Sequence, residues 1–430
     1  MINSIGIRRE DKHIWEKRIA LSPEDCAKLI KRGINIILQP SSIRCFSDKE
    51  YIRVGAQIKE DLQECDFLLG VKEMPKEFIQ PNRAHLFFSH TIKGQPYNMP
   101  LLKEILDKNA TLLDYERIVD ENNRRLIAFG RFAGLAGVID TLSLLGKRWQ
   151  SKKIVNPLVN ILFSMQYKAF GEARQAVLQI ENSLKSLDRP LKIALIGNGN
   201  VSHGVQEILR LLPLAKVSPE ELKKEDCPNL VYAIFEEKDF VVPKNPEQPF
   251  ELQDYYNNPQ KYSACFEQYL PYLDVVINTI YWDARYPRLV TNEALQSLFS
   301  KNPSPRLEVI GDISCDIEGA MQCTVKCTTP GSPSFVFDPM TKAITDGWEG
   351  KGVAVLAVDT LPCEFPLDAS IYFSEKLIPL LLEIIQADLS GTLEESKLPS
   401  CIIPSVIVWK GKLTPQYQYL QEKIRSVIPN

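Results

Sequence analysis

The feature that most constrains the fold is a glycine-rich turn between an apolar run and a helical pattern. The run Leu191–Ile196 leads into Gly197-Asn-Gly199, and a helix-like pattern then covers residues 201–212. A strand, a tight glycine turn and a helix N-terminus in this order form a place for a pyrophosphate, because the free N–H groups and the dipole of the helix supply positive potential. Gly197 permits the turn, and Gly199 lets the backbone approach the phosphates. A Gly-x-Gly alone is weak evidence, but here the strand and the helix flank it in the required order.

Composition limits the classes of function that need to be considered. A chain of 430 residues is long enough for two domains with separate cores. Its net charge of −3 gives no reason to expect nucleic acid or an anionic membrane surface as a partner. The 10 cysteines are scattered, and the close pair Cys323 and Cys327 has no histidine nearby. We therefore expect reduced thiols, with no metal site and no disulfide framework.

The sequence also bears on localisation. The apolar stretch 377–385 is short and contains Pro379 and Glu383, so it predicts a core helix and no membrane span. Charged sequence begins at residues 8–11, which leaves no room for a signal or transit peptide in front of it. We therefore expect a cytoplasmic protein.

The first third of the chain alternates short apolar runs with helical patterns. Strand-like runs cover residues 5–7, 34–39, 66–72 and 84–90, and Ser22-Pro23 followed by two acids is typical of a helix start. Strands that alternate with helices indicate a parallel sheet with helices on its faces.

The rest of the chain predicts a second lobe of the same class. Residues 134–187 are mostly helical and connect the lobes, residues 219–272 read as irregular insertions, and strand signals return at 275–278, 307–311 and 352–359. A C-terminal segment with Trp409 is expected to return and cover the first lobe. The predicted fold is therefore α/β, with two Rossmann-like lobes and mostly parallel sheets. Residues 1–138 with 356–430 form a discontinuous substrate lobe, and residues 139–355 form a dinucleotide-binding lobe.

Charged residues that follow apolar runs are candidates for proton transfer. Lys72 and Glu73 follow one run of the first lobe, His90 follows the next, and Glu116 follows a third. Ligands of open α/β sheets bind outside the carboxyl ends of the strands, so these side chains are expected to converge as an acid/base set. The alternative is that each charge marks only where the chain reaches solvent. Arg18 could hold a substrate carboxylate with two parallel hydrogen bonds, or it is an ordinary surface arginine.

The choice of cofactor depends on the end of the second strand after the glycines. NAD-binding folds usually place an acid there, whereas this chain has Ala215-Lys216-Val217-Ser218. Ser218 would not repel a 2′-phosphate and Lys216 would attract one, which favours NADP with NAD as the alternative. The acids at 220–221, just beyond Ser218, and those at 236–237, which end another strand-like run, count against that preference.

Beyond these general patterns, the chain resembles one family along almost its whole length. It is similar to the lysine-ketoglutarate reductase half of bifunctional aminoadipic semialdehyde synthases. Lysine-forming saccharopine dehydrogenases are more distant relatives, and alanine dehydrogenase and transhydrogenase are more distant again. The segments that carry the resemblance, in order, are Trp15–Pro23, Gly70–Pro75, Phe87–Lys93, Asp114–Glu116, Ala128–Gly134, Gly197–Ser202, Ile280–Trp282 with Pro287, Gly311–Asp316, Cys327–Thr329 and Val358–Pro362.

The resemblance implies an alanine-dehydrogenase-like fold and a reaction in which L-lysine, 2-oxoglutarate and NADPH give saccharopine. It implies that Lys72 and His90 are the acid/base pair, that Glu73 and Glu116 tune them, and that Arg18 and Lys93 hold carboxylates. It also implies two sets of cofactor-binding residues. Gly197, Gly199, Asn200, Val201 and Ser202 would line the pyrophosphate, and Asn278, Ile280, Tyr281 and Asp312 would border the nicotinamide.

Two departures from the family pattern affect these expectations. The glycine loop reads Gly-Asn-Gly where Gly-Thr-Gly is usual, and Ser218 stands where the relatives tend to have Glu. No saccharopine-splitting domain follows in these 430 residues, so another protein would process the product, or the enzyme runs toward lysine. The alternatives are therefore NAD-dependent saccharopine oxidation, reduction of an imine from another amine, and a binding module without turnover. A homodimer is expected for this fold.

Overall fold

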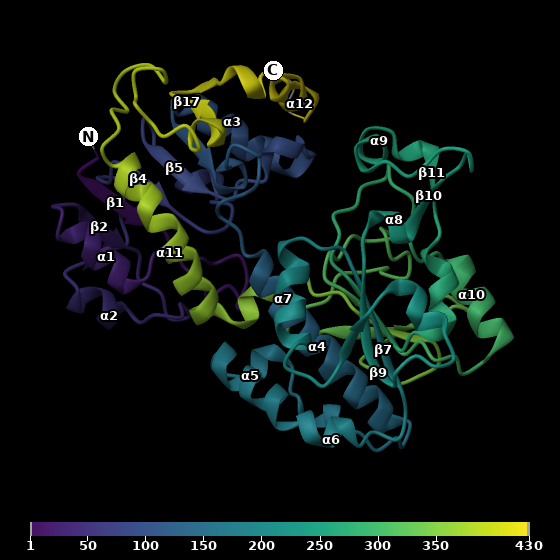
Figure 1. The fold of residues 1–430 in the computed structure, drawn as a ribbon. Helices are drawn as coiled ribbons and strands as arrows, with labels where there is room; N and C mark the ends of the chain where they lie inside the picture. Colours follow the sequence, from purple (N-terminus) through teal and green to yellow (C-terminus); the bar gives the residue numbers. More distant parts are fainter. Residues whose placement is uncertain (1, 428–430) are drawn as a thin grey trace. The chain divides into compact units, whose positions relative to one another are not determined.

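The computed structural model describes residues 2–427, which divide into two compact units. The first unit joins the chain up to Phe129 with the chain from Pro366 onward, and the second unit is Gly130–Phe365. In Figure 1 the first unit accordingly combines the purple-to-blue and the yellow ends of the colour scale. The domain boundaries expected from the sequence fall inside helix α4 (Gly130–Ser151) and strand β16 (Val353–Leu356).

The first unit is built on an eight-stranded sheet in the order β18-β17-β6-β5-β4-β1-β2-β3. The pairs from β3 to β6 are parallel, whereas β17 pairs antiparallel with both β6 and β18. The strands are β1 (Ser4–Ile7), β2 (Asn35–Leu38), β3 (Gln57–Ile58), β4 (Phe67–Leu69), β5 (Ala84–Phe87), β6 (Thr111–Asp114), β17 (Val406–Trp409) and β18 (Lys412–Leu413). The helices are α1 (Pro23–Ile30), α2 (Asp48–Arg53), α3 (Met99–Asp107), α11 (Pro366–Ile384) and α12 (Leu420–Val427).

The local sequence explains the central elements of this sheet. All residues of β4 and β5 are buried, as expected for parallel strands covered on both faces. Helix α1 begins where it was predicted, because the Ser22 side chain accepts a hydrogen bond from the Asp25 N–H and Pro23 occupies the first turn. The prediction of a parallel sheet with helices on its faces is confirmed. The C-terminal segment, however, extends the sheet, because β17 pairs with β6, and so it does not simply cover the lobe.

The second unit contains another eight-stranded sheet, in the order β15-β14-β16-β13-β12-β7-β9-β8. Its strands are β7 (Leu191–Ile196), β8 (Ala215–Val217), β9 (Leu230–Phe235), β12 (Val275–Asn278), β13 (Val309–Asp312), β14 (Ser334–Phe337), β15 (Ile344–Asp346) and β16. A separate hairpin pairs β10 (Val241–Pro243) with β11 (Tyr262–Ala264). The remaining helices are α5 (Phe170–Gln179), α6 (Glu181–Lys185), α7 (Asn200–Leu209), α8 (Glu237–Phe240), α9 (Leu252–Asn257) and α10 (Asn292–Lys301).

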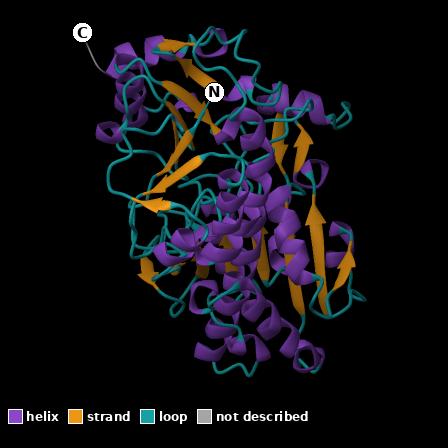
Figure 2. Ribbon diagram, turned by 90° about the vertical axis from the view of Figure 1, so that its left-hand side faces the viewer, coloured by secondary structure: helices purple, strands orange, loops and turns teal. Residues whose placement is uncertain are grey.

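Helices cover both faces of the second sheet, and Figure 2 shows them (purple) alongside the strands (orange). Ile310 of β13 belongs to a core that includes Leu295 of α10. Its neighbour Gly311 faces α4, where an added Cβ would stand 2.2 Å from the Thr141 hydroxyl. Successive residues of a strand point to opposite faces, so α10 and α4 lie on opposite sides.

Some segments are more regular than the sequence suggested. The stretch expected to be irregular, 219–272, contains strand β9, the hairpin, and helices α8 and α9. The apolar stretch 377–385 lies at the end of helix α11, which agrees with the predicted core helix. Within residues 2–427, no helix combines the length and the apolar character that a membrane crossing requires.

Candidate active site

Four neighbouring parallel strands of the first unit end at one edge of the sheet, and each is followed by a titratable side chain. Glu10 follows β1, Lys72 and Glu73 follow β4, His90 follows β5 and Glu116 follows β6. Strand pairing makes β6, β5, β4 and β1 consecutive neighbours in the sheet. This strand order is consistent with the prediction that the charged residues after these strands lie along one edge of the sheet.

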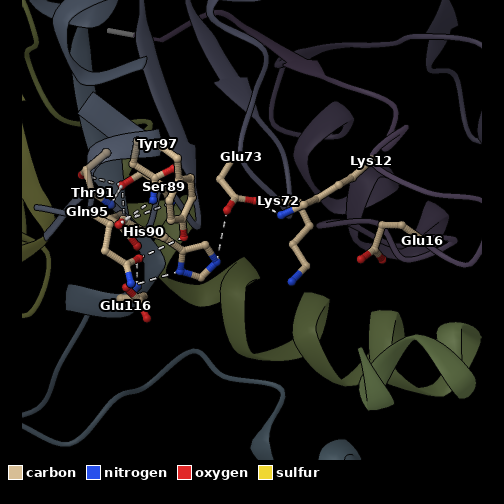
Figure 3. A network of polar contacts seen from close by, with 12 residues as sticks. Lys12, Glu16, Lys72, Glu73, Ser89, His90, Thr91, Gln95, Tyr97 and Glu116 are labelled. Carbon is tan, nitrogen blue, oxygen red and sulfur yellow. Dashed lines mark hydrogen bonds and ion pairs between the residues drawn. The ribbon is translucent and has the colours of Figure 1, made fainter. Parts of the chain in front are cut away.

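His90 is the centre of the arrangement, with a carboxylate on each side of its ring (Figure 3). Its Nε2 lies 3.8 Å from a carboxylate oxygen of Glu73, and its Nδ1 lies 3.7 Å from one of Glu116. His90 has a left-handed backbone conformation, with φ of +52°, and its carbonyl accepts a hydrogen bond from Asn98 at 2.9 Å. The ring is about one-third exposed (31 %), so it can meet a ligand. This geometry suits an imidazole that exchanges a proton with a substrate.

Both carboxylates beside His90 are kept in the charged form. Burial raises the pKa of Glu73, but the charges of His90 and Lys12 lower it by a larger amount. The pKa of Glu73 therefore lies below its ordinary value. Burial likewise raises the pKa of Glu116, and His90 and Arg125 more than compensate. Lys12 Nζ lies 3.0 Å from Glu73, and the Arg125 guanidinium lies 3.1 Å from Glu116. Each carboxylate therefore connects His90 to a cation on its far side.

The buried carboxyl group of Asp114 supports the backbone next to His90 and Glu116. Asp114 is fully buried and accepts hydrogen bonds from the Ser89 hydroxyl and, at 2.9 Å, from the Ser89 N–H. It also accepts from the Glu116 N–H at 2.8 Å. Burial and the neighbouring Glu116 carboxylate raise the pKa of Asp114 to about 6. One buried group thus fixes both the segment that leads into His90 and the backbone of Glu116.

Lys72 reaches the same edge and leaves its ammonium available. Its backbone N–H donates to Glu10 at 3.1 Å, and the N–H of Val71 donates to the same carboxylate at 2.6 Å. Burial and the charge of Glu16 raise the pKa of Glu10 to about 7. Figure 3 draws no contact from Lys72 Nζ, and within residues 2–427 that nitrogen has no hydrogen-bond or ion-pair partner. The predicted set is therefore assembled in part: His90 contacts both Glu73 and Glu116, whereas the Lys72 side chain joins neither contact.

The two residues predicted to bind carboxylates, Arg18 and Lys93, lie in different environments. Arg18 is 3 % exposed and makes two hydrogen bonds to Glu16, at 2.8 and 2.6 Å. Its guanidinium also stacks 4.2 Å from the centroid of the Phe129 ring. An internal carboxylate thus occupies the bidentate face that a substrate was expected to use. Lys93 is exposed on the short helix that follows His90, and its charge contributes to lowering the pKa of Glu116.

Three residues of this network were not predicted: Glu10, Lys12 and Arg125. Glu10 and Lys12 follow β1, so the rule that selected Lys72 and His90, a charge after a strand, also applies to them. Arg125 is different, because it lies on a turn that returns to Val119 through an isolated bridge. Nothing in the local pattern shows that such a turn brings its arginine back to Glu116.

In the second unit the glycine loop has the expected strand–turn–helix geometry. Gly197 has φ of +97°, and an added Cβ would stand 2.9 Å from the side chains of Thr279 and Ile280. Gly199 caps α7 without any side-chain hydrogen bond, and a Cβ at this position would meet nothing within 4 Å. Because Gly199 provides no capping side chain, the N–H groups of Asn200, Val201 and Ser202 at the start of α7 can bind an anion.

The strand that lies beside β7 in the sheet is β9, and not β8 as the sequence suggested. The residues 215–218 were counted as the second strand, but β8 lies at the sheet edge and β9 pairs directly with β7. Ser218 is engaged locally, since its N–H and hydroxyl both donate to Glu221 at 2.7 Å. Glu236 follows β9 instead, and it accepts a hydrogen bond from Asn198 of the glycine loop at 3.0 Å. An acid therefore does follow the strand next to β7, and it is Glu236, one of the acids that counted against NADP in the sequence.

The residues predicted to border a nicotinamide lie at the ends of adjacent strands β12 and β13. Asp312 is buried and accepts hydrogen bonds from Asn278 at 2.8 Å and from the Thr324 hydroxyl at 2.6 Å. Burial raises the pKa of Asp312 to about 6. The backbone N–H of Ile280 lies 3.5 Å from the Asn278 amide oxygen, and Tyr281 beyond it is exposed. Asn278 and Asp312 are thus a fixed base for the loop that carries Ile280 and Tyr281.

We expect Gly199→Ala to separate ligand binding from folding. The added methyl group has open space in the free protein, and alanine limits the unfolded chain, so thermal stability should be unchanged or slightly higher. A phosphate on the helix N-terminus would need that space, so the dissociation constant for the dinucleotide should rise about tenfold or more. Fluorescence titration with NADH and a melting curve of the same sample check both values. Unchanged affinity would remove the glycine loop as the pyrophosphate site.

Family models match both parts of the chain. "Alanine dehydrogenase/PNT, N-terminal domain" matches residues 6–136, and "Alanine dehydrogenase/PNT, C-terminal domain" matches residues 241–416. Among solved structures, an L-alanine dehydrogenase superposes with a TM-score of 0.66 at 16 % identity, covering 98 % of this chain and 99 % of the other. A transhydrogenase from Sinorhizobium meliloti superposes with a TM-score of 0.58 at 14 % identity, covering 96 % and 100 %. The predicted fold class, alanine-dehydrogenase-like with two mostly parallel sheets, is confirmed.

Curated relatives are more similar in sequence. The chain is 36 % identical to an alpha-aminoadipic semialdehyde synthase of Arabidopsis thaliana, over 98 % of this chain and 42 % of the relative. It is 34 % identical to a mitochondrial alpha-aminoadipic semialdehyde synthase of Bos taurus, over 97 % and 47 %. A saccharopine dehydrogenase [NAD(+), L-lysine-forming] of Emericella nidulans is 27 % identical over 89 % and 92 %. The chain thus spans less than half the length of the two synthases. From the two domain matches and this similarity, the chain belongs to the alanine dehydrogenase/PNT family.

Proposed function

We propose that this protein is a nicotinamide-dependent oxidoreductase that condenses L-lysine with 2-oxoglutarate and reduces the resulting imine to saccharopine. The observation that carries the proposal is His90 held between two charged carboxylates, with Lys72 beside it on the same sheet edge. Similarity to the synthases over nearly the whole chain supports the choice of substrates. We also propose that the first unit is the substrate domain and the second unit the dinucleotide domain.

The reaction needs repeated proton transfer, and this chain has groups for each transfer. The ε-amine of lysine must lose a proton before it attacks the ketone carbon, and the carbinolamine oxygen must gain one to leave as water. We assign these transfers to His90 and to Lys72, whose ammonium has no partner among the residues that the structure describes. Glu73 and Glu116 lie beside the two ring nitrogens of His90, and we assign them to orienting the imidazole. The dinucleotide supplies the hydride that reduces the imine carbon.

Substrate carboxylates need cations, and the structure suggests a different set from the sequence. Saccharopine carries three carboxylates. Because Arg18 is engaged with Glu16, we assign it to fixing the loop between β1 and α1. Arg125 and Lys93 are exposed and lie beside Glu116, and we propose them as carboxylate-binding cations. A substrate carboxylate would then replace part of the contact between Arg125 and Glu116.

The residues of the second unit fit a dinucleotide. The uncapped N-terminus of α7 would hold the pyrophosphate, and the loop after Asn278 would border the nicotinamide. The sequence favoured NADP because Ser218 ends β8. We propose the opposite preference, for NAD(H), because Glu236 follows the strand beside β7 and contacts the glycine loop. Glu237 and Asp239 lie next to it, with Lys238 as the cation at 3.7 Å, so the local charge repels a 2′-phosphate.

Replacing Glu236 tests this preference directly. We expect Glu236→Ser to raise the ratio of kcat/KM for NADPH to that for NADH by about 10- to 100-fold, because it removes about 1–3 kcal/mol of repulsion at short range. Ser218→Ala serves as the matched control at the other strand end and should leave the ratio unchanged. If the Ser218 variant changed the ratio and the Glu236 variant did not, the original prediction for NADP would be restored.

The activity itself is tested by nicotinamide absorbance during incubation with lysine and 2-oxoglutarate, with NADH and NADPH in parallel. Consumption that requires both substrates supports the reductase. Consumption of neither cofactor would contradict it and lead to saccharopine with NAD⁺ and NADP⁺. The second candidate, NAD-dependent oxidation of saccharopine to lysine, is favoured by Glu236 and by the similarity to lysine-forming saccharopine dehydrogenases. A cytoplasmic location and a homodimer remain predictions.

A further inference from the structure

Two of the ten free cysteines meet beside the end of β13, on the side of the nicotinamide residues. Cys315 follows Asp312 by three positions and has φ of +58°, and Cys327 lies on the segment that leads to Thr328. The Cys327 thiol lies 3.7 Å from the Cys315 carbonyl oxygen. The first thiol is half-buried and the second is exposed, so a small reagent can reach one of them directly.

A shared anchor explains why the two thiols are held together. The carbonyl of Ala357 accepts a hydrogen bond from the Cys315 thiol at 2.7 Å and another from the Thr328 N–H at 2.8 Å. Because Thr328 is the next residue after Cys327, both cysteine segments are fixed to one point at the end of β16. Burial and the nearby Cys327 thiol raise the pKa of Cys315, and burial raises the pKa of Cys327.

We propose that Cys315 and Cys327 form a reversible intramolecular disulfide by exchange with a low-molecular-weight disulfide such as oxidised glutathione. The exposed Cys327 thiolate attacks one sulfur of the reagent, whose S–S bond breaks and releases one thiol. The Cys315 thiolate then attacks Cys327 Sγ and releases the second thiol. Two cysteine thiols are oxidised, the reagent is reduced to two thiols, and the two cysteine protons end on those thiols.

The position of the pair links its redox state to the dinucleotide site. The N–H of Cys315 donates to Asp312 at 3.3 Å, and Thr324, which lies three residues before Cys327, donates to the other oxygen of Asp312 at 2.6 Å. A disulfide would move the Cys315 sulfur from the Ala357 carbonyl toward Cys327 and would tie these two segments together. We therefore expect the oxidised protein to bind the dinucleotide about fivefold or more weakly. This consequence rests on the proposed function, whereas the disulfide itself does not.

The test equilibrates the whole protein in oxidised and reduced glutathione, blocks free thiols by alkylation, and maps peptides by mass spectrometry. A peptide pair linked through Cys315 and Cys327 is expected, with both thiols returning after reduction. Neither Cys315→Ser nor Cys327→Ser should give it. Cys265→Ser is the matched control, because the Cys265 thiol also contacts a backbone carbonyl at 3.7 Å and the variant leaves the pair intact. Formation should accelerate about tenfold per pH unit near neutrality, because the thiolates react.

Two outcomes would overturn the proposal. One is that Cys315 stays alkylatable at equilibrium, and the other is that Cys327 accumulates only as the mixed disulfide with glutathione. Peptide mapping needs no substrate, so either outcome is distinct from a failure of the proposed reaction. Titration with NADH before and after oxidation then tests the link to Asp312, and equal affinities would disprove that link.

Discussion

Lys72→Met should lower turnover by about 10²- to 10⁴-fold, the range expected when a positioned proton-transfer group is lost. The side-chain nitrogen of Lys72 has no hydrogen-bond or ion-pair partner within residues 2–427, so the substitution breaks no internal salt bridge. Methionine keeps the length and most of the volume of the stem, so packing against the end of β4 should survive. The loss should therefore appear in kcat and in the pH profile, with an unchanged melting temperature.

The matched control is Lys76→Met, which changes an exposed lysine in the same loop. It should retain wild-type turnover, and both variants should bind NADH with wild-type affinity, because the dinucleotide residues belong to the other unit. Steady-state kinetics across pH and an NADH titration are the two measurements. Normal turnover in the Lys72 variant would remove this residue from the proposed chemistry. A loss shared by the Lys76 variant would show that the loop, and not the ammonium, is responsible.

Gly134→Ala should affect both stability and dinucleotide binding in the second unit. Helices α4 and α7 approach so closely that a Cβ at Gly134 would stand 2.0 Å from the Val201 carbonyl oxygen and 2.9 Å from the Val205 N–H. Both contacts are with backbone, so no side-chain rotation relieves them, and α7 must move. Overpacking of this kind costs about 1–3 kcal/mol or more, which corresponds to a melting temperature lower by about 2–12 °C for a domain of this size.

The same shift displaces the helix N-terminus that we assign to the pyrophosphate. NADH affinity should therefore fall about tenfold or more, in contrast to Gly199→Ala, which is expected to weaken binding without loss of stability. Gly171→Ala is the matched control, because a Cβ at that glycine of α5 meets nothing within 4 Å. Calorimetry and NADH titration of the three variants give the comparison. Wild-type affinity in a destabilised Gly134 variant would separate α7 from the dinucleotide site.

Much of this site could be predicted because its residues follow strands that are recognisable in the sequence. His90, Glu73 and Glu116 were found in this way, and the order of parallel strands brings them together. What the sequence could not reveal depends on contacts between distant segments. The pairing of β9 with β7 is one example, because chain order alone suggested β8 and therefore Ser218.

The role of Arg18 was obscured for a different reason. Glu16 is only two residues away, but whether the two side chains face each other depends on the loop conformation between β1 and α1. Arg125 likewise reaches Glu116 through a turn whose path has no local signature. Charged residues can thus be located by pattern, whereas the question of which charges neutralise one another needs the folded chain.

The pairing of β17 with β6 has a consequence for synthesis on the ribosome. Lys410 and Thr111, which are hydrogen-bonded across this pairing, lie 299 residues apart. At typical elongation rates of about 5–20 residues per second, the partner of β6 emerges roughly 15 to 60 s after β6 itself. Until then the nascent chain presents an unpaired strand edge, and such edges template intermolecular association. A chaperone that binds nascent chains would therefore be most useful to this protein while its middle segment is being translated.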